Sequence, residues 1–311
     1  MEIMEIVLYG AGVRGKKIEK ILYTNGIIIR GFCDTNKTGY VECEDGRNYP
    51  ILTIKEILRG GYTVIVTVGN YASRVEITDK LIKDKVVVVA IEDVLKSTGD
   101  AVIDNRNFIA EYHVDEMDDY FERAEGEESL GVFWGNDSVF HQMFNRLDTT
   151  DIVELACGRG RHIPHYVDQA NHITLVDILD KNIEYCRERF HGVEKISYYK
   201  NNGYDLQELG SNTYTSLFTY DAMVHFEMLD IFNYLKETRR ILRDGGKALF
   251  HHSNNTENYK ITFSTGTSGR NYMSSELFAY LANRAGLKVI EQKTIDWEGT
   301  RNLDCLTLVE K

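Results

Sequence analysis

The sequence predicts an α/β protein with two domains, each built on a mostly parallel β-sheet covered by helices on both faces. Short apolar segments alternate with helical segments along most of the chain, which is typical of such sheets. An apolar strand followed by a glycine turn and a helix also occurs twice, at residues 5–22 and from residue 151 onward. A stretch of different composition separates the two series, so we expect domains at 1–97 and 151–311 joined by a segment at 98–150.

Composition and charge restrict the class of partner. The 311 residues are 43% apolar and carry a formal net charge of -12, so the chain has no broad basic surface for a phosphate backbone. We therefore expect a small-molecule partner and no nucleic acid. No apolar run approaches the ~20 residues that cross a bilayer, so we expect no membrane partner.

Five cysteines without CxxC spacing argue against a disulfide framework, which favours a cytoplasmic location. The sequence leaves the oligomeric state open, including a homo-oligomer.

The first glycine turn is typical of a nucleotide site. A strand at residues 5–9 leads into Gly10, Gly12 and Gly15 in Gly-x-Gly-x-x-Gly spacing, and Asp34 ends the next expected strand, 27–33. In this context the glycines approach a diphosphate at a helix N-terminus and the acid binds a ribose. Further strands are expected at 62–68 and 86–90, with a helix at 72–83. The sequence thus predicts a small Rossmann-like nucleotide-binding domain, too short for the second half that hydride transfer needs.

The segment 98–150 is acidic, yet it carries apolar residues on one helical face. We expect one or two helices that bridge the domains. Three aromatic residues of this segment are candidates for a lid that covers a ligand: Tyr120, Phe133 and Trp134. Packing between the domains is the simpler role.

The second series begins with a different glycine turn. Glu154 precedes Gly158-x-Gly160, and a carboxylate there suits a ligand with an amino group and no phosphate. Asp177 ends the next strand, where it can bind both ribose hydroxyls. Asn202 and Gly203 follow the third strand, where an amide can reach the amino group of an adenine in the ligand.

Asp221 and His225 follow the fourth strand and face the crevice. The strands are expected at 151–156, 172–176, 196–200, 213–220, 247–252, 287–297 and 302–309. One helix places Met228, Ile231, Leu235 and Leu242 inward and closes at Asp244-Gly245-Gly246, and another runs from 274 to 285.

In its order of motifs, the region from about 117 to 311 resembles a seven-stranded class I S-adenosylmethionine-dependent methyltransferase, whose sheet ends in an antiparallel hairpin. The resemblance implies S-adenosylmethionine as methyl donor. It places the following residues in the cofactor pocket: Glu154, Ala156, Cys157, Gly158, Gly160, Asp177, Ile178, Asn202, Gly203 and Asp221. The region 5–95 resembles the small Rossmann-like domains of bacterial sugar-modifying enzymes, which implies a docking or acceptor-binding role.

Methyl transfer to a hydroxyl needs an aligned nucleophile and a base, and histidine is the natural base near neutral pH. His225 follows the fourth strand, and His251 and His252 end the fifth. Because neighbours on a strand point to opposite faces, at most one of the last two enters the crevice.

Two further assignments concern a metal and the acceptor. Asp221, His225 and His252 lack tight ligand spacing, so no metal site is expected. Arg270, in a polar loop at 266–272, is a candidate for binding a phosphate or carboxylate of the acceptor, with a surface charge as the alternative.

The sequence therefore predicts a methyltransferase that acts on an oxygen of a sugar, sugar nucleotide or related small metabolite, in glycan or secondary-metabolite biosynthesis. The alternatives are an NAD(P)-dependent oxidoreductase that uses the first turn, a non-catalytic nucleotide-binding protein, and an RNA methyltransferase, which the acidic charge disfavours.

Overall fold

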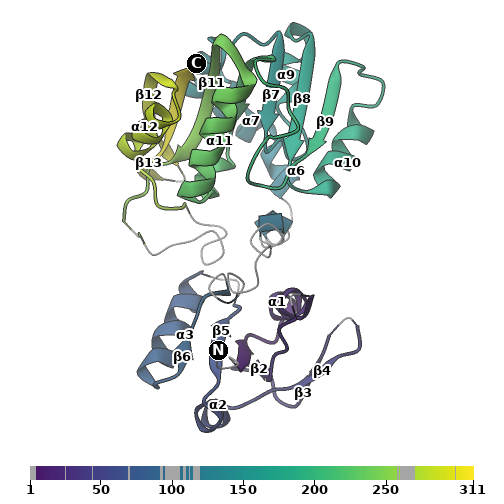
Figure 1. Ribbon diagram of the computed structural model, residues 1–311, viewed down its shortest axis with the longest axis vertical. Coiled ribbons are helices and arrows are strands. Elements are labelled where there is room, and N and C mark those ends of the chain that lie inside the picture. Colours follow the sequence, from purple (N-terminus) through teal and green to yellow (C-terminus); the bar gives the residue numbers. More distant parts are fainter. Residues whose placement is uncertain are drawn as a thin grey trace. The chain divides into compact units, whose positions relative to one another are not determined.

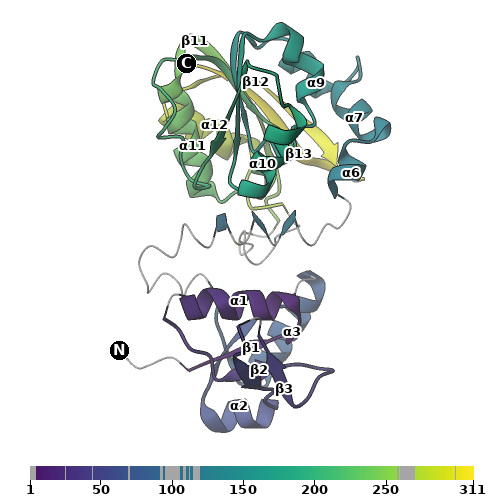
Figure 2. The ribbon, with the colours of Figure 1, turned by 90° about the vertical axis from the view of Figure 1, so that its right-hand side faces the viewer.

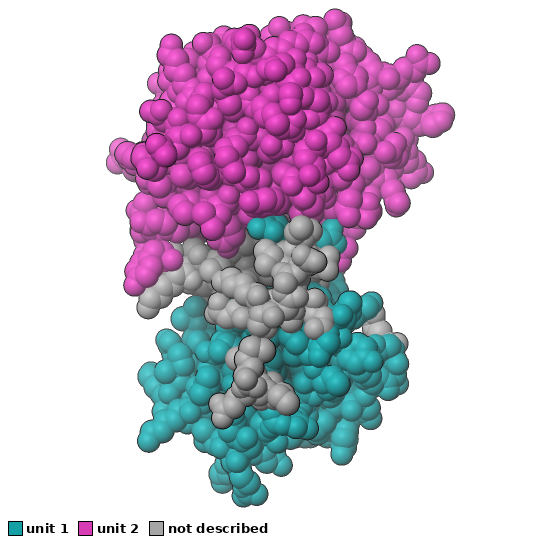
Figure 3. Space-filling view, viewed as in Figure 1, with its two compact units in different colours: residues 1–108 teal, residues 109–311 magenta. Residues whose placement is uncertain are grey.

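The chain forms two compact units, a first unit at 1–108 and a second unit at 109–311 (Figure 3). The computed structural model describes all residues except 1–4, 25, 44, 69–70, 92–93, 95–105, 108–109, 112, 115–119, 258, 260–269 and 298; the side chains of 71–72 are also outside the description. Parts of the predicted bridge at 98–150 and most of the polar loop before Arg270 therefore lie outside the described residues.

The first unit contains a four-stranded parallel sheet in the order β2-β1-β5-β6 (Figure 1). Its strands are β1 (Ile6–Tyr9), β2 (Gly31–Cys33), β5 (Thr63–Val66) and β6 (Val87–Val88). Helices α1 (Val13–Thr24), α2 (Ile54–Gly60) and α3 (Tyr71–Lys83) accompany them. Apolar side chains on the two faces of the sheet fill two separate clusters, so both faces are buried.

Two elements of the first unit were not expected from the sequence. A hairpin of β3 (Tyr40–Glu42) and β4 (Asn48–Pro50) follows β2. Helix α2 begins with a capping box, in which Thr53 and Glu56 each bond the other's backbone N–H, and it ends at Gly61 in the left-handed conformation. Strand β2 is also shorter than expected, because it pairs with β1 only from Gly31 onward.

The second unit contains a seven-stranded sheet in the order β12-β13-β11-β10-β7-β8-β9. Its strands are β7 (Asp151–Leu155), β8 (His172–Asp177), β9 (Ile196–Lys200), β10 (Tyr214–Thr219), β11 (Leu242–Ser253), β12 (Lys288–Trp297) and β13 (Thr300–Glu310). Strand β13 runs antiparallel to both β11 and β12, whereas the other pairs are parallel. The predicted mixed sheet with an antiparallel hairpin is confirmed.

Helices cover both faces of this sheet (Figures 1 and 2). One face packs against α11 (Met228–Ile241) and α12 (Ser275–Arg284). The other packs against α7 (Glu127–Trp134), α8 (Val139–Phe144), α9 (Ile163–Tyr166) and α10 (Asp180–Arg189). The remaining short helices are α6 (Tyr120–Ala124), η2 (Val167–Gln169) and η3 (Met223–His225). The strands therefore alternate side chains between two apolar layers, which fixes their register.

The predicted end of α11 was wrong. The helix stops at Ile241, and Leu242 already has extended dihedral angles and pairs with Tyr214 of β10. The register between β10 and β11 then shifts, and Gly245, with a φ of 78°, lies in that irregular part of β11. The two glycines thus serve a strand irregularity and not a helix cap. Met228, predicted to face inward, is 37% exposed at the start of the helix.

In the part of the chain that the structure describes, no helix has the length and apolar character needed to span a membrane.

Candidate active site

A cavity of about 360 Å³ lies in the second unit, beside the loops that follow β7, β8 and β10. The carboxyl ends of neighbouring parallel strands meet here, which is where open α/β sheets bind ligands. Six predicted cofactor residues line the cavity: Ala156, Cys157, Gly158, Asp177, Ile178 and Asp221. His225 and Arg270 also line it.

The glycine turn after β7 has an unusual backbone that only small residues fit. Gly158 and Gly160 have φ values of 54° and 74°, and Ala156 adopts a φ of 58° despite its Cβ. A Cβ on Gly160 would lie 2.5 Å from the ring of Phe190, and one on Gly158 would lie 3.1 Å from Phe121. Gly160 does not line the cavity, so its role is to allow the backbone of the turn to pack against Phe190.

Asp177 ties the turn to the end of β8. Its Oδ2 accepts a hydrogen bond from the backbone N–H of Gly158 at 2.9 Å. Its Oδ1 accepts from the backbone N–H of Leu179 at 2.9 Å and from Nδ2 of Asn182 at 3.1 Å. Burial raises the pKa of Asp177, and these hydrogen bonds oppose that rise. A carboxylate is thus held in the cavity wall at the predicted ribose position.

Glu154 lies beneath the turn and does not line the cavity. It is 2% exposed, and its Oε2 accepts a hydrogen bond from the hydroxyl of Tyr166 at 2.7 Å. No described residue hydrogen-bonds its Oε1. Burial raises the pKa of this carboxyl to about 8. A buried acid with an unused oxygen is suited to a cationic ligand group.

Asn202 and Gly203, the predicted adenine contacts, do not line the cavity. Asn202 Oδ1 accepts hydrogen bonds from the backbone N–H groups of Tyr204 and Asp205, both at 2.9 Å. Gly203 supplies a φ of 75° within the same turn. Asn202 therefore folds its own loop, as asparagine often does.

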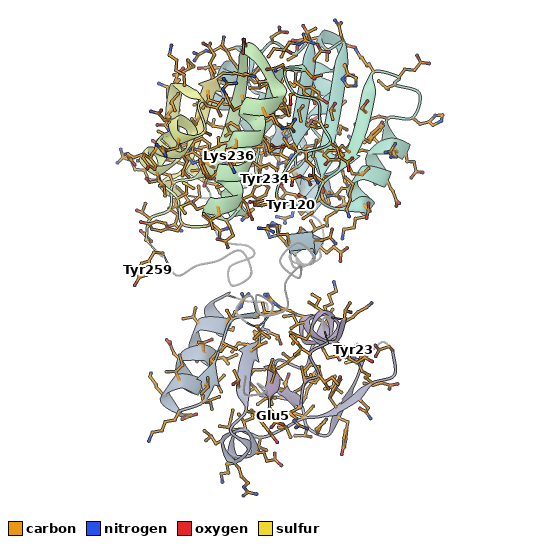
Figure 4. The ribbon with its side chains drawn as sticks, viewed as in Figure 1. Glu5, Tyr23, Tyr120, Tyr234, Lys236 and Tyr259 are labelled. Carbon is orange, nitrogen blue, oxygen red and sulfur yellow. The ribbon has the colours of Figure 1, made fainter. Side chains whose placement is uncertain are left out.

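Asp221 lies at the far side of the cavity from β8, in the loop after β10. Its Oδ2 accepts hydrogen bonds from the hydroxyl of Tyr120 at 2.7 Å and from Nη2 of Arg161 at 3.2 Å. Tyr120, labelled in Figure 4, belongs to α6. Burial alone would raise the pKa of Asp221, but Arg161, together with the other polar groups around it, lowers it. Asp221, whose side chain is 10% exposed, is therefore an ionised carboxylate.

Of the three predicted histidines, only His225 lines the cavity. Its ring lies 4.5 Å, centroid to centroid, from the ring of His113, which lines the same cavity. His225 remains the candidate base.

His251 and His252 point to opposite faces of β11, as the alternation predicts, but both are fully buried outside the cavity lining. Nδ1 of His252 donates to the carbonyl of Ser253, and its Nε2 accepts from the hydroxyl of Thr307, both at 2.8 Å. Burial lowers the pKa of His252 to about 3, and its ring stacks on Phe278. Packing of β13 and α12 against β11 places both rings in the core, so neither of these two predicted bases lines the cavity.

Arg270 lines the cavity, but its charge is already paired. Its Nε donates to Oδ1 of Asp304 at 3.0 Å, and its Nη2 donates to Oδ2 at 2.7 Å. The guanidinium also lies over the ring of Trp297, 4.9 Å from the centroid. This bidentate pairing leaves less of the side chain for an anionic acceptor than the sequence suggested.

Several lining residues were missed or only partly anticipated. Arg161 directly follows the glycine turn, and that spacing would have been a usable signal. Tyr220 and Trp297 had no such signal. Of the three suggested lid residues, Tyr120 and Phe133 line the cavity, whereas Trp134 donates through Nε1 to His162.

The four N-terminal candidate residues lie together in the first unit. Gly10, with a φ of 119°, follows β1, and Asp34 Oδ2 accepts the backbone N–H of Ala11 at 2.8 Å. A Cβ on Gly15 would lie 1.9 Å from the carbonyl oxygen of Gly10, whereas one on Gly12 would meet no atom within 4 Å. Gly15 is thus required for packing and Gly12 is not.

Comparison with solved structures finds similar folds that cover part of this chain. The structure of an S-adenosylmethionine-dependent methyltransferase from Mesorhizobium loti is similar, with 13% identity and a TM-score of 0.47 over 55% of this chain and 97% of that one. A second such methyltransferase, from Aquifex aeolicus, has 11% identity and a TM-score of 0.46 over 60% of this chain and 95% of that one. No curated protein matches the sequence.

The match that bears on activity is to a family model. Residues 152–246, which contain the glycine turn, Asp177 and Asp221, match a family described as a methyltransferase domain. The second unit therefore carries a methyltransferase domain, and the protein is an enzyme that uses S-adenosylmethionine as its cofactor.

Proposed function

We propose that the enzyme transfers the methyl group of S-adenosylmethionine to a hydroxyl oxygen of a sugar, sugar nucleotide or related small metabolite, in glycan or secondary-metabolite biosynthesis. One observation carries the proposal: a single cavity combines a glycine turn held by Asp177 with Asp221 and His225 on another loop. The five free, buried cysteines support a reducing, cytosolic setting for this activity.

The residues around the turn suit the cofactor. Asp177 offers a carboxylate in the cavity wall for ribose hydroxyls, and the bare backbone at Gly158 leaves room beside it. Glu154 has a buried oxygen without a partner among the described residues, which matches an ammonium group. When bound, S-adenosylmethionine supplies a methyl group on a positively charged sulfur, which an oxygen nucleophile can attack directly.

The remaining lining residues then bind the acceptor. Aromatic rings of Phe133, Tyr220 and Trp297 line the cavity and suit the face of a sugar ring. They also exclude water from the reacting atoms. The carboxylate of Asp221 accepts hydrogen bonds from the hydroxyl groups of the substrate that is methylated, and Arg161 donates to them. His225 takes the proton of the attacking hydroxyl, a role that typically contributes about 10²–10⁴-fold to rate.

The first unit supports the sugar-nucleotide part of the proposal. Gly10, Gly15 and Asp34 form the strand, turn and acid arrangement that binds nucleotides in Rossmann-like domains. In our proposal this unit binds the nucleotide portion of the acceptor.

The proposal is tested by comparing two aspartates that hold equivalent turns. Isothermal titration calorimetry with S-adenosylhomocysteine is expected to show affinity about 100-fold lower for Asp177→Ala than for wild type, a loss of about 2.7 kcal/mol. Asp34→Ala is the matched control, because its carboxylate accepts a turn N–H in the first unit, and it should bind S-adenosylhomocysteine as wild type does. Wild-type affinity in Asp177→Ala would contradict the assigned cofactor site.

The acceptor class and the role of the first unit need two further measurements on the same proteins. Transfer of radiolabelled methyl to a panel of sugars and nucleotide sugars should identify an acceptor, and His225→Ala should then lower kcat about 100-fold or more without changing affinity for S-adenosylhomocysteine. Titration with UDP and NAD separates the alternatives. Binding of NAD that Asp34→Ala abolishes, without methyl transfer to any sugar, would favour the oxidoreductase.

A further inference from the structure

Asp221 has a backbone conformation that needs support. Its φ is 55°, in the left-handed region, which is unfavourable for a residue with a Cβ. Strained residues of this kind persist only where neighbouring groups hold them in place. The backbone N–H of Asp221 donates a hydrogen bond to Nδ1 of His251 at 3.0 Å. His251 is therefore a direct support of the strained residue.

The bonding around His251 fixes its protonation. A backbone N–H can only donate, so Nδ1 must be the unprotonated nitrogen and the ring proton must be on Nε2. That nitrogen lies 3.0 Å from Oδ2 of Asp304, a fully buried carboxylate that accepts the proton in a hydrogen bond. Both ring nitrogens are used, so His251 has no position left for a proton from a substrate.

Asp304 connects His251 to the cavity wall. Its two oxygens accept from Nε and Nη2 of Arg270, which lines the cavity. A continuous series of hydrogen bonds therefore runs from Arg270 through Asp304 and His251 to the backbone of Asp221. The carboxylate of Asp221 returns to the cavity, where it meets Tyr120 and Arg161.

We infer that His251, Asp304 and Arg270 form a positioning unit that holds Asp221 in its left-handed conformation, with its carboxylate directed at Tyr120 and Arg161 in the cavity. These are positioning residues and not catalytic ones, because they act through Asp221. The inference rests on the proposed function only for the use of the cavity by cofactor and acceptor.

The chain contains a matched control for a purely structural histidine. His252 is the next residue on β11, is equally buried, and also forms two hydrogen bonds. Its partners, Ser253 and Thr307, do not line the cavity. Substitutions at His251 and His252 should therefore cost similar global stability but differ in their effect on Asp221.

The test compares His251→Gln and Asp304→Asn with the control His252→Gln. Asp304→Asn is informative because it replaces one carboxylate oxygen with an NH₂ group. Either orientation of the amide places this NH₂ group against a donor of Arg270 or His251, so a hydrogen bond of the series is lost. We expect amide hydrogen exchange of Asp221 to be at least tenfold faster in His251→Gln and Asp304→Asn than in His252→Gln. Equal exchange of the Asp221 amide in all three variants would overturn the inference.

Imidazole nitrogen NMR of the wild-type protein provides a second readout that does not depend on the folding of any variant. We expect the ring proton of His251 on Nε2 and an unprotonated Nδ1. Protonation on Nδ1 would remove the bond to Asp221 and would also overturn the inference.

Failure of this inference is distinguishable from failure of the proposed function. The hydrogen bonds that link Arg270, Asp304, His251 and Asp221 do not include the glycine turn, so affinity for S-adenosylhomocysteine should stay within about threefold of wild type in all variants, a change below 0.7 kcal/mol. Once an acceptor is identified, kcat should fall in His251→Gln and not in His252→Gln. Lack of methyl transfer to sugars would contradict the proposed function while the exchange and NMR results still decide the role of His251.

Discussion

The two units build their first turn with the same backbone hydrogen bonds. In the first unit, Gly10 N–H donates to the carbonyl of Cys33 at 2.8 Å, and the next N–H, of Ala11, donates to the Asp34 carboxylate. In the second unit, Cys157 N–H donates to the carbonyl of Val176 at 3.0 Å, and the next N–H, of Gly158, donates to Asp177. An acid at the end of the second strand therefore holds the turn in both units, whatever ligand it also binds.

The units differ in the residue beneath the turn. The position four residues before the aspartate-bonded N–H is Val7 in the first unit and Glu154 in the second. Val7 is fully buried in an apolar cluster, whereas Glu154 is a buried acid. The shared backbone hydrogen bonds do not distinguish the two turns. We propose that the residue beneath the turn selects the ligand, because only the second turn has a carboxyl there.

The helices after the turns differ in the same sense. Helix α1 has 12 residues and begins directly at the first turn, which favours an anion at its N-terminus. Helix α9, after the second turn, has 4 residues and continues as the short η2. The second turn thus lacks a long helix dipole, which suits a cofactor that carries an ammonium and no phosphate.

The largest expected effect tests the carboxyl beneath the second turn through pH. The folded pKa of Glu154 is raised by burial from 4.5 to about 8, so the folded protein holds a proton that the unfolded chain releases. This contribution to stability is complete below about pH 4.5 and is lost as pH rises through about 8. The free energy of unfolding of wild type should therefore fall relative to that of Glu154→Gln across this range, by up to about 4 kcal/mol.

Chemical denaturation of both proteins at pH 5 and pH 8.5 measures this difference. Saturating S-adenosylhomocysteine should reduce the pH dependence of wild type, because an ammonium beside Glu154 favours the ionised carboxyl. The same pH dependence in wild type and Glu154→Gln would show that Glu154, like Val7, is only a packing residue.

The positions of three parallel strands in the second unit were predictable because β7, β8 and β10 are short, largely apolar runs, and because β7 leads into a glycine turn. The contact between Gly158 and Asp177 followed from local spacing, since the two residues meet at adjacent strand ends. The loop position of Asn202 did not, because an asparagine after a strand can also accept hydrogen bonds from its own loop, as it does here from the N–H groups of Tyr204 and Asp205.

The acceptor side could not be predicted in the same way. Its walls come from segments far apart in sequence, such as Phe133 of α7 and Trp297 of β12, and no local pattern predicts that they face one cavity. Alternation along β11 correctly placed His251 and His252 on opposite faces. The alternation could not predict that β13 and α12 cover these histidines, because both elements are distant from β11 in the sequence.

A smaller effect is expected from glycines of the first turn. In Gly15→Ala the new Cβ would lie 1.9 Å from the Gly10 carbonyl, so helix α1 must shift, and the first unit should lose about 3 kcal/mol of stability. Gly12→Ala is the matched control. Its Cβ meets nothing within 4 Å, and the change in stability should stay within about 1 kcal/mol. Thermal unfolding of the two variants makes the comparison, and equal losses would contradict the packing role of Gly15.

The smallest effect concerns the strain at Ala156, which lines the cavity with a φ of 58°. Ala156→Gly relieves about 1–2 kcal/mol of left-handed strain and adds about 0.5–1 kcal/mol of chain entropy to the unfolded state, so stability should rise by up to about 1 kcal/mol. Ala170→Gly is the control, because Ala170 is buried and has an ordinary φ of -91°, and it should be destabilised by about 1 kcal/mol.

Calorimetric measurement of S-adenosylhomocysteine binding to the same two variants shows what the strain at Ala156 does. A more stable Ala156→Gly with weaker binding would mean that the strained backbone holds the second turn ready for its ligand. Destabilisation equal to that of Ala170→Gly would mean that position 156 stores no strain, and the two turns would then differ in the carboxyl beneath the second turn and in the helices that follow them.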